Sequence, residues 1–563
     1  MLGCSYTLCY KSLPNPTPHQ LTYYGKPILF PKLPRKATWR LLLWKCILTS
    51  SLQLYKGPVL CILFDLSHML RSGILSPQGY NFYSDSVLTI MATFTLASWA
   101  TSLTYANLTA PVVDAAVKSI YNWAGCAIGG FAQAAPQIAL NTSLSAGFGG
   151  PPTSSILGLN GSLDGKGVGF GIEPGFADAQ VAAFINGIAS HVDDYDDTHL
   201  ASIIHPTGVV ASALFAIAEA ESRSQGNGNQ ATGGVSGTDF LTAFVAGIEA
   251  ELKLGLSVYP EHYDVGWHIT STTGSVGAAV AVGKLLGLDT EHLQHAIGIA
   301  STQVIGMQAF FGSMTKSFHI GRATQGGMLA ALLAQKGYTS SLTALEDKYG
   351  WLHVVSTREN ASANFAQLGK GTWEIERNTF KPFPCGIVMH PTIDGCIQLH
   401  NQVLDEGKSI ESIKSINLRV NPEVLVLTGQ TDPQTGLEGK FSIYHAAAVA
   451  LLYGQATPTQ FTDQVVQNET VISMRKLVNV TTDNSVGEDQ AYTTITFNDD
   501  STKENYIEHA IGSLENSLTV EDLKTKFIDQ ASRQIGSVRA ERAYNSFTTI
   551  GNITDVGKLR SLF

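Results

Sequence analysis

The chain has 563 residues, enough for two or more domains that each bury a core. Its composition, 44% hydrophobic and 15% charged, fits a compact protein with much buried helix and excludes a largely disordered chain. The seven cysteines are scattered and form no CxxC pair, so we expect no disulfide framework, zinc site or iron–sulfur cluster.

Neither a nucleic acid nor a membrane is an expected partner. The net charge of −10 provides no electrostatic footprint for nucleic acid, although local cationic pockets for acidic small molecules are compatible with it. The uncharged stretch 86–113 is long enough to resemble a membrane span. Thr, Ser, Asn and Tyr fill about half of that stretch, however, which argues against a membrane helix.

Residues 1–90 differ in composition and periodicity from the rest of the chain. They are rich in proline, hold four of the seven cysteines and show no sustained helical or strand period. We interpret them as an N-terminal extension outside the fold, either disordered or an extension of the gene model whose true start is Met91. Lys and Arg outnumber acidic residues here, as in a transit peptide, but the amphipathic Arg/Ser pattern is missing. Cytoplasmic and mitochondrial locations therefore both stay open.

Residues 91–372 are predicted to form a large all-helical domain. Val112, Ala116, Ile120 and Trp123 recur every three to four residues, as on one face of an amphipathic helix. A Gly-, Ser- and Pro-rich loop follows over 143–176, and its "GKGVGFG" lacks the GK[ST] ending of a phosphate-binding loop. Further helical patterns cover 178–192, 208–222, 239–256, 274–288, 290–304 and 323–337.

Residues 373–514 are predicted to form a smaller α+β lid domain. The stretches 412–428 and 491–508 alternate apolar and polar residues, and the second contains an Asn-Asp-Asp turn typical of a hairpin. Residues 515–563 return to helix, with Thr519 as the predicted cap and acidic residues in the first turn, and are expected to rejoin the helical domain. The fold class is thus mainly α.

Five sequence segments contain ionisable residues flanked by glycines or apolar residues, and we take them as candidate functional sites. They are "DDYDDTH…HPTG" (193–208), "GWHITSTTG" (His268), "GSMTKSFHIG" (Lys316 and His319), "FKPFPCGIVMHPTID" (Lys381 and His390) and "KFSIYHAAA" (Tyr444 and His445). Alone, each has a structural explanation, because a buried His is more often a satisfied core residue and an Asp before a helix is usually a cap. Together, several Lys and His converging on one pocket would bind a di- or tricarboxylate.

Three other readings of these residues are weaker. Asp193, Asp194 and Asp197 satisfy the DDxxD spacing of a magnesium-dependent prenyl-diphosphate enzyme, but a second acidic motif is missing. The spacings of His191, His199 and His205 do not suit a zinc site, and HExxH is absent. The serine motif GxSxG is absent too. We therefore expect no metal and no cofactor.

In this order, the five stretches resemble the MmgE/PrpD family of cofactor-free lyases, which includes 2-methylcitrate dehydratase and cis-aconitate decarboxylase. The most specific pieces are "HVDDYDDTH" with "HPTG", "GWHITSTTGSVGAA", "MTKSFHIGRATQGG" and the Lys-Pro-Phe-Pro turn before "HPTID". The resemblance implies a helical domain, a smaller lid, an active site in the cleft between them and a homodimer. It implies a catalytic set of His205, His268, Lys316 and Tyr444 and a substrate-binding set of Asp194, Thr198, Lys381 and His390.

Those residue types suit the removal of water from a citrate. His205 or His268 is the candidate base, Tyr444 or the other His the candidate acid, and the lysines supply fixed positive charge. Asp194 is expected to face the substrate, and Asp197 to cap the following helix. Decarboxylation of cis-aconitate to itaconate would use nearly the same pocket, and a non-enzymatic binding protein is a third reading.

One departure from the family pattern favours dehydration. Animal decarboxylase members carry a histidine important for activity two residues after the lid Phe-Pro, where this chain has Gly386. A glycine cannot exchange a side-chain proton. We therefore favour dehydration of 2-methylcitrate or a longer 2-alkylcitrate, in secondary metabolism, with cis-aconitate decarboxylation as the alternative.

Overall fold

The computed structural model describes residues 22–23, 26–27, 92–159, 175–225, 234–357 and 361–562. The chain divides into two compact units, Met1–Asn81 and Phe82–Phe563. In the first unit the description is limited to strands β1 (Thr22–Tyr23) and β2 (Lys26–Pro27), which pair antiparallel. The interpretation of residues 1–90 as an extension outside the fold otherwise concerns residues that lie outside this description.

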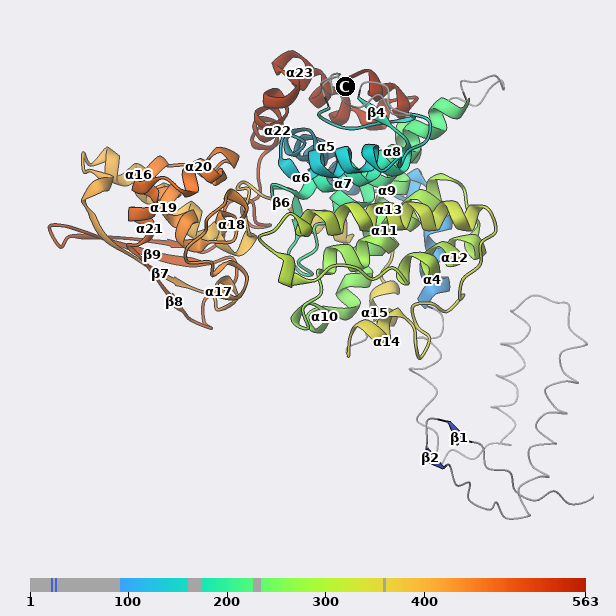
Figure 1. Cartoon of the computed structure of the whole chain (residues 1–563), viewed down its shortest axis with the longest axis horizontal. Coiled ribbons are helices and arrows are strands. Elements are labelled where there is room, and N and C mark those ends of the chain that lie inside the picture. Colours follow the sequence, from blue (N-terminus) through green and yellow to red (C-terminus); the bar gives the residue numbers. More distant parts are fainter. Residues whose placement is uncertain are drawn as a thin grey trace, which may run out of the picture. The chain divides into compact units, whose positions relative to one another are not determined.

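A large helical domain occupies most of the second unit (Figure 1). Its helices are α4 (Ala92–Ser102), α5 (Ala110–Gly130), α6 (Ala134–Ser145), α7 (Ala179–His191), α8 (Pro206–Gln225), α9 (Gly237–Val258), α10 (Glu261–Asp264), α11 (Ile269–Leu285), α12 (Thr290–Ser301), α13 (Thr315–Gln335), α14 (Trp351–Val355) and α15 (Ala361–Phe365). Helix α5 begins where sequence chemistry favours it, since the Thr109 side chain accepts from the Val112 amide and Pro111 occupies the first turn. The predicted helical patterns are confirmed.

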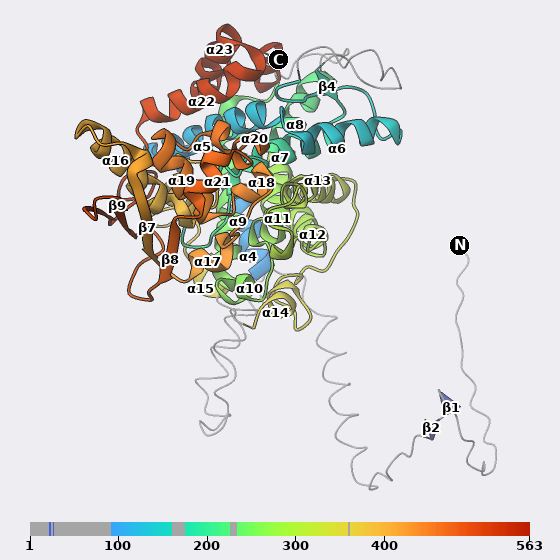
Figure 2. The ribbon, with the colours of Figure 1, turned by 60° about the vertical axis from the view of Figure 1, so that its left-hand side comes forward.

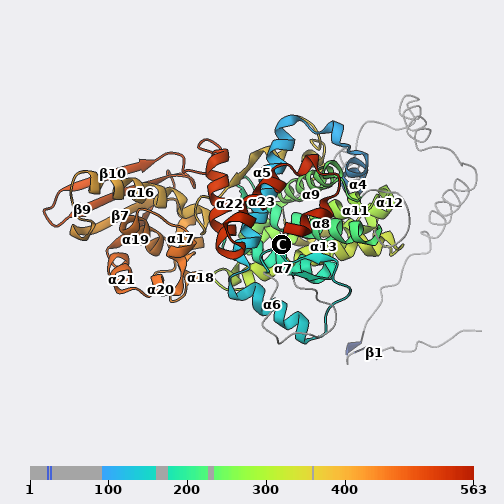
Figure 3. The ribbon, with the colours of Figure 1, turned by 90° about the horizontal axis from the view of Figure 1, so that it is seen from above.

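Helix α11 lies at the centre of this domain and packs against α8, α9, α12 and α13 (Figure 3). All its residues from Ile269 to Gly283 are buried. This explains why small and apolar residues occur on every face of the helix rather than on one face only. Glycine allows a close crossing between α7 and α13: a Cβ on Gly321 would stand 2.7 Å from the Phe184 carbonyl oxygen. This crossing brings the end of α7 close to the start of α13, where candidate site residues lie.

A smaller α+β domain has its own hydrophobic core, formed between residues 383 and 497. Strands β7 (Ile413–Val420), β8 (Val478–Thr482), β9 (Ala491–Phe497) and β10 (Thr502–Ile507) form a sheet in the order β10-β9-β7-β8, with only β7 and β8 parallel. Helices α16 (His390–Asp405) and α19 (Ile443–Tyr453) pack on this sheet (Figure 1), with α18 (Gly436–Gly439), α20 (Asp463–Val466) and α21 (Glu469–Arg475) beside them.

The structure confirms the predicted hairpin and corrects its neighbour. Strands β9 and β10 pair antiparallel around the Asn-Asp-Asp turn, in which Asp500 takes a φ of 61°. The stretch 412–428, in which apolar and polar residues alternate, forms a strand only as far as Val420. Beyond it, Pro422 starts the short helix α17 (Glu423–Thr428), because proline suits a first helical turn and lacks the amide a strand ladder needs.

The C-terminal helices return to the helical domain. Helix α22 (Val520–Ile535) packs against α5 and against α23 (Ser537–Thr548), as Figure 2 shows. The predicted cap at Thr519 is confirmed, since its side chain accepts from the Asp522 amide. The mainly-α fold with a smaller α+β domain is therefore confirmed, while the exact limits 91–372, 373–514 and 515–563 remain our proposal. None of the helices in the described ranges is long and apolar enough to cross a membrane.

Candidate active site

The acidic segment at residues 193–197 directs its carboxylates to different partners. Asp193 accepts from Gln133 and Lys440, Asp194 from Lys316 and Lys381, and Asp196 pairs with His191. Asp197 begins the strand β5 (Asp197–His199), which pairs antiparallel with β6 (Asn378–Phe380). The four carboxylates are thus engaged by different partners.

Asp197 is not the helix cap that the sequence predicts. Its Oδ2 accepts from the side chains of Thr207 and Asn378, and not from a backbone amide of α8. Burial and then the neighbouring Asp196 raise the pKa of Asp197 to about 6. Asp197 therefore holds β6 and the start of α8 together, next to the site.

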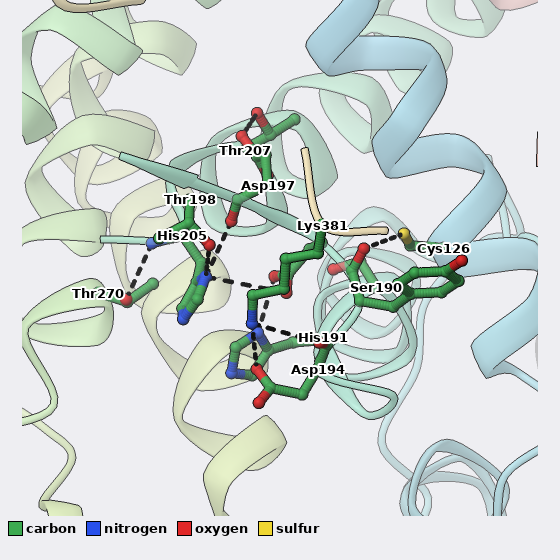
Figure 4. Close-up of polar contacts among 12 residues, drawn as sticks. Cys126, Ser190, His191, Asp194, Asp197, Thr198, His205, Thr207, Thr270 and Lys381 are labelled. Atoms are coloured by element: carbon green, nitrogen blue, oxygen red, sulfur yellow. Dashed lines mark hydrogen bonds and ion pairs between the residues drawn. The ribbon is translucent and has the colours of Figure 1, made fainter. Parts of the chain in front are cut away.

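Asp194 is the junction of two buried ammonium groups. Its Oδ1 accepts from Lys316 Nζ and from Lys381 Nζ, each at 2.8 Å. Burial alone would raise the pKa of Asp194, but the charges of Lys316 and Lys381 outweigh it and hold the pKa well below its usual value. Asp194 also has a φ of 50°, a left-handed conformation that aspartate tolerates better than most residues. Figure 4 shows Lys381 reaching the Asp194 carboxylate beside the ring of His191.

The two lysines come from different parts of the chain. Lys316 lies in the first turn of α13, and Lys381 directly follows β6. Burial lowers the pKa of Lys316, against the opposite effect of Asp194. Its ammonium also lies 5.2 Å and 5.1 Å from the ring centroids of Phe311 and Phe441, within cation–π range. Two cations are therefore held in apolar surroundings by one carboxylate oxygen.

His205 is held as a neutral imidazole with one nitrogen free to accept a proton. Its Nδ1 lies 2.8 Å from the Asp197 carbonyl oxygen and 3.0 Å from Thr198 Oγ1 (Figure 4). A carbonyl can only accept, so this contact assigns the proton to Nδ1 and leaves Nε2 as the acceptor. Burial and then Lys381 lower the pKa of His205 to about 3. The imidazole is therefore unprotonated, and able to act as a base, at neutral pH.

His268 forms a second imidazole group at the start of α11. Its Nδ1 lies 3.0 Å from His319 Nδ1, and its Nε2 is buried without a partner among the described residues. Burial and then His191 hold the pKa of His268 well below its usual value, and burial lowers that of His319 to about 4. The ring of His191 lies 5.1 Å from that of His205 and 5.7 Å from that of His268. Three imidazole rings thus lie in tilted contact through His191.

These groups line one cavity, which lies between the two domains. On the helical side the polar lining consists of Asp194, His205, His268, Lys316 and Lys381, which we call the cavity cluster. Ile203, Tyr263 and Phe311 complete that side. The smaller domain contributes Gly386, Ile387, Val388, Leu427, Thr428 and Phe441. The cavity volume is about 40 Å³, so lining residues have to move before a ligand larger than a few atoms can enter.

Comparison with known proteins identifies the chain. The MmgE/PrpD N-terminal domain matches residues 95–364, and the MmgE/PrpD C-terminal domain matches residues 383–548. The chain belongs to the MmgE/PrpD family.

Named relatives within this family are lyases. A cis-aconitate decarboxylase-like protein of Aspergillus oryzae is 29% identical over 403 residues, which cover 68% of this chain and 82% of the relative. The cis-aconitate decarboxylase of Mus musculus is 29% identical over 368 residues, or 63% of this chain and 72% of the relative. The 2-methylcitrate dehydratase of Escherichia coli strain K12 is 24% identical over 213 residues, covering 36% and 43%.

Three residues expected at the site from the MmgE/PrpD resemblance lie elsewhere. Thr198 is fully buried in β5 and contacts His205 rather than the cavity. His390, at the start of α16, lines a neighbouring cavity and packs edge-on against Phe383 at 5.3 Å. Tyr444 packs against the core of the smaller domain from α19, and Phe441, three residues earlier, faces the cavity instead. Thr198 can position His205, whereas Tyr444 is not among the residues that line the cavity, and its role as the acid stays a prediction.

Sequence reasoning missed two lysines that tie the domains together around the site. Lys440 donates to the Asp193 carbonyl at 2.8 Å and to the Pro384 carbonyl at 3.3 Å. Lys526 on α22 donates to the carbonyls of Tyr195 and Lys381, at 2.7 Å and 2.8 Å. Burial lowers the pKa of Lys526 to about 8. Lys526 was detectable in principle, since it follows the helical period of the buried face of α22.

The cavity is poorly suited to a metal ion. The ligand atoms of His191, Asp194 and Asp196 lie within 4.8 Å of one another, and all three residues are buried. Asp194 already accepts from two ammonium groups, however, and their charge repels a cation. The same charges favour anionic ligands.

Proposed function

We propose that this protein is a cofactor-free lyase that dehydrates 2-methylcitrate or a longer 2-alkylcitrate. One observation carries the proposal: neutral imidazoles and two buried ammonium groups line the same closed cavity, so a base, an acid and anion-binding charge are available together. The printed names of the relatives, decarboxylases of cis-aconitate and dehydratases of 2-methylcitrate, agree with a tricarboxylate as substrate.

The lysines would bind the substrate carboxylates. Each ammonium group has three donors. Asp194 occupies one donor of Lys316 and two of Lys381, through its carboxylate and its carbonyl, so both lysines keep at least one donor for an anion. The carboxylate of Asp194 fixes both ammonium groups in place before substrate arrives, and this preorganisation avoids reorganisation during the reaction. The aromatic rings around Lys316 exclude water and strengthen its field.

His205 is our proposed base. Its Nε2 would take the proton from the carbon beside a carboxylate, and the electron pair left behind would form the new C=C bond as the C–O bond breaks. The leaving hydroxide would take a proton from Lys316, whose pKa is lowered by burial, and depart as water. The lysine charges would stabilise the enolate-like carboxylate that develops meanwhile.

Position 386 favours dehydration over decarboxylation. Gly386 lines the cavity, and a Cβ there would stand 2.7 Å from the Thr428 methyl group. This chain therefore has neither a proton-exchanging side chain at 386 nor free space for one, unlike the animal decarboxylase members with a histidine there. Dehydration has its base and acid without it.

Decarboxylation of cis-aconitate to itaconate is the second candidate. The similarity to named decarboxylases extends over 403 residues, against 213 for the dehydratase of Escherichia coli. That reaction breaks a carbon–carbon bond and needs only anion-binding charge and an acid for the allylic carbanion, which the same lysines offer. The proton NMR experiment below distinguishes dehydration from decarboxylation.

We also propose a homodimer, working in secondary metabolism. A groove on the helical domain supports the dimer, since Ile138, Phe148, Met314 and Phe318 are exposed together there. Analytical ultracentrifugation of wild-type protein and of Phe148→Asp tests this state. A monomer in the wild type would contradict it.

Proton NMR of the full-length protein tests the reaction. We expect incubation with 2-methylcitrate or 2-butylcitrate to give a new trisubstituted alkene with the carbon count preserved. Loss of carbon dioxide from cis-aconitate, with the methylene signals of itaconate, would replace dehydration by decarboxylation. Inertness toward all three compounds would contradict both candidates.

A further inference from the structure

A second cavity adjoins the candidate active site and shares one wall with it. Its volume is about 200 Å³, larger than that of the cavity at the lysines. Ile203, Ile387 and Val388 line both cavities, so these three side chains lie between them. The remaining lining includes Pro391 and the stretch Ala510–Ser513, which approach from the smaller domain.

The chemistry of the second cavity suits a hydrocarbon and not a carboxylate. Apart from His390, the charged groups that line it are Glu488 and Asp489, which are exposed and partly exposed, so they lie toward solvent. No lysine or arginine of the described residues is part of its lining. Acidic groups repel the carboxylates of a tricarboxylate, while buried aliphatic walls favour an alkyl chain. Burial, followed by Lys381, lowers the pKa of His390 to about 3, so its imidazole adds no positive charge.

The wall between the cavities has an unusual backbone. Ile203 has a φ of 54°, a left-handed conformation that β-branched residues rarely adopt. Its turn is closed by a hydrogen bond from the His199 amide to the Ile204 carbonyl at 2.8 Å, which holds Ile203 in place. Strained residues of this kind cluster at ligand sites. Asp194 in the neighbouring cavity cluster also has a positive φ.

We propose that the second cavity binds the alkyl branch of the substrate while its carboxylates occupy the cavity cluster. The inference rests on the proposed function and narrows its substrate class to 2-alkylcitrates with more than one carbon in the branch. Ile203, Ile387 and Val388 act as the gate that the branch displaces, and the volume beyond them sets the upper limit of chain length. Each methylene that leaves water in this cavity should improve binding about fourfold.

Two substitutions fill the second cavity without touching the cavity cluster. Ala510→Leu places a larger side chain in its lining, and Ile511→Phe does so at the next position, in case the first variant folds poorly. Ala456→Leu is the matched control, because Ala456 is buried in the same domain and lines neither cavity. Thermal unfolding of all three checks that the comparison is between folded proteins.

The experiment measures kcat/KM for 2-methylcitrate and for 2-butylcitrate. We expect the ratio of kcat/KM for 2-butylcitrate to kcat/KM for 2-methylcitrate to fall by at least about tenfold in Ala510→Leu or Ile511→Phe. This is the effect of excluding two or more methylene groups of the branch from the second cavity. The control should keep the wild-type ratio. An unchanged ratio in both filling variants would overturn the proposal.

Binding measured by calorimetry tests the alkyl-binding cavity independently of the proposed dehydration reaction. If the protein turns over cis-aconitate and no alkylcitrate, the proposed dehydration fails, but the cavity is still tested by alkylcitrates as ligands. Affinity that rises with branch length in the wild type and stays flat in the filling variants supports the cavity. Affinity that is independent of branch length in the wild type overturns it.

Discussion

Two buried clusters near the acidic segment use the same side-chain types in different settings. The cavity cluster joins Asp194 to Lys316 and Lys381, with His205 nearby. A second group, which we call the interior cluster, joins Glu374 to Lys253 at 2.7 Å and to His199 at 3.1 Å. Both contain a carboxylate, an ammonium group and an imidazole.

The clusters differ in what their polar atoms face. His199 uses both ring nitrogens, on Ser202 and Glu374, and the interior cluster lines none of the cavities described above. His205 uses only Nδ1, and the lysines of the cavity cluster keep donors for a ligand. Burial and charge therefore do not by themselves mark a catalytic group. We propose that unused hydrogen-bonding capacity toward a cavity is the better mark of a catalytic group.

Replacing the imidazole should give the largest contrast between the clusters. We expect His205→Ala to lower kcat by about 10²- to 10⁴-fold, because the base is lost. The folded state should persist. His199→Ala is the matched control, and it should mainly reduce stability, since it leaves the buried Glu374 with one partner fewer. Steady-state kinetics together with chemical denaturation measures both effects, and near-normal activity of His205→Ala would refute the assigned base.

Replacing a lysine should separate activity from stability in the same way. Lys316→Ala is expected to lower kcat by about 10²- to 10³-fold, the cost of removing one charge-stabilising donor. Asp194 would keep Lys381, so the fold survives. Lys253→Ala should instead lower the free energy of unfolding by about 3–5 kcal/mol, because Glu374 loses its buried cation. Equal losses of activity in the folded fractions of both variants would erase the distinction between the clusters.

A pH titration isolates the imidazole of the cavity cluster. In the unfolded chain His205 binds a proton below about pH 6.5, whereas in the folded protein burial and Lys381 lower its pKa to about 3. The unfolded state therefore binds the extra proton below pH 6.5, and the free energy of unfolding falls as pH decreases. Between pH 7 and 5 the wild type should lose roughly 2 kcal/mol more than His205→Gln. Denaturation curves at both pH values measure the difference, and equal losses would contradict the neutral imidazole.

The sequence predicts the architecture better than the orientation of individual side chains. Amphipathic periods located the long helices, and capping chemistry located the start of α22, because both are local properties. The short segment 423–428 was wrongly included in the predicted strand 412–428, because the helix that follows Pro422 was not recognised. The junction of Asp194 with Lys316 and Lys381 joins residues 122 and 187 positions apart, so only the family resemblance could bring them together.

Tyr444 shows most clearly that side-chain orientation was not predicted. It lies three residues from the cavity residue Phe441, yet it packs against the core of the smaller domain. Phe441 lines the cavity just before Ser442 caps α19, whereas Tyr444, inside the helix, packs against the core of the smaller domain. If unused capacity toward the cavity is what marks a catalytic group, Tyr444→Phe should change kcat by less than about twofold. Kinetics of this variant beside His205→Ala measures the effect. A loss comparable to that of His205→Ala would mean that α19 rotates toward the cavity when substrate binds, and that Tyr444 is the acid after all.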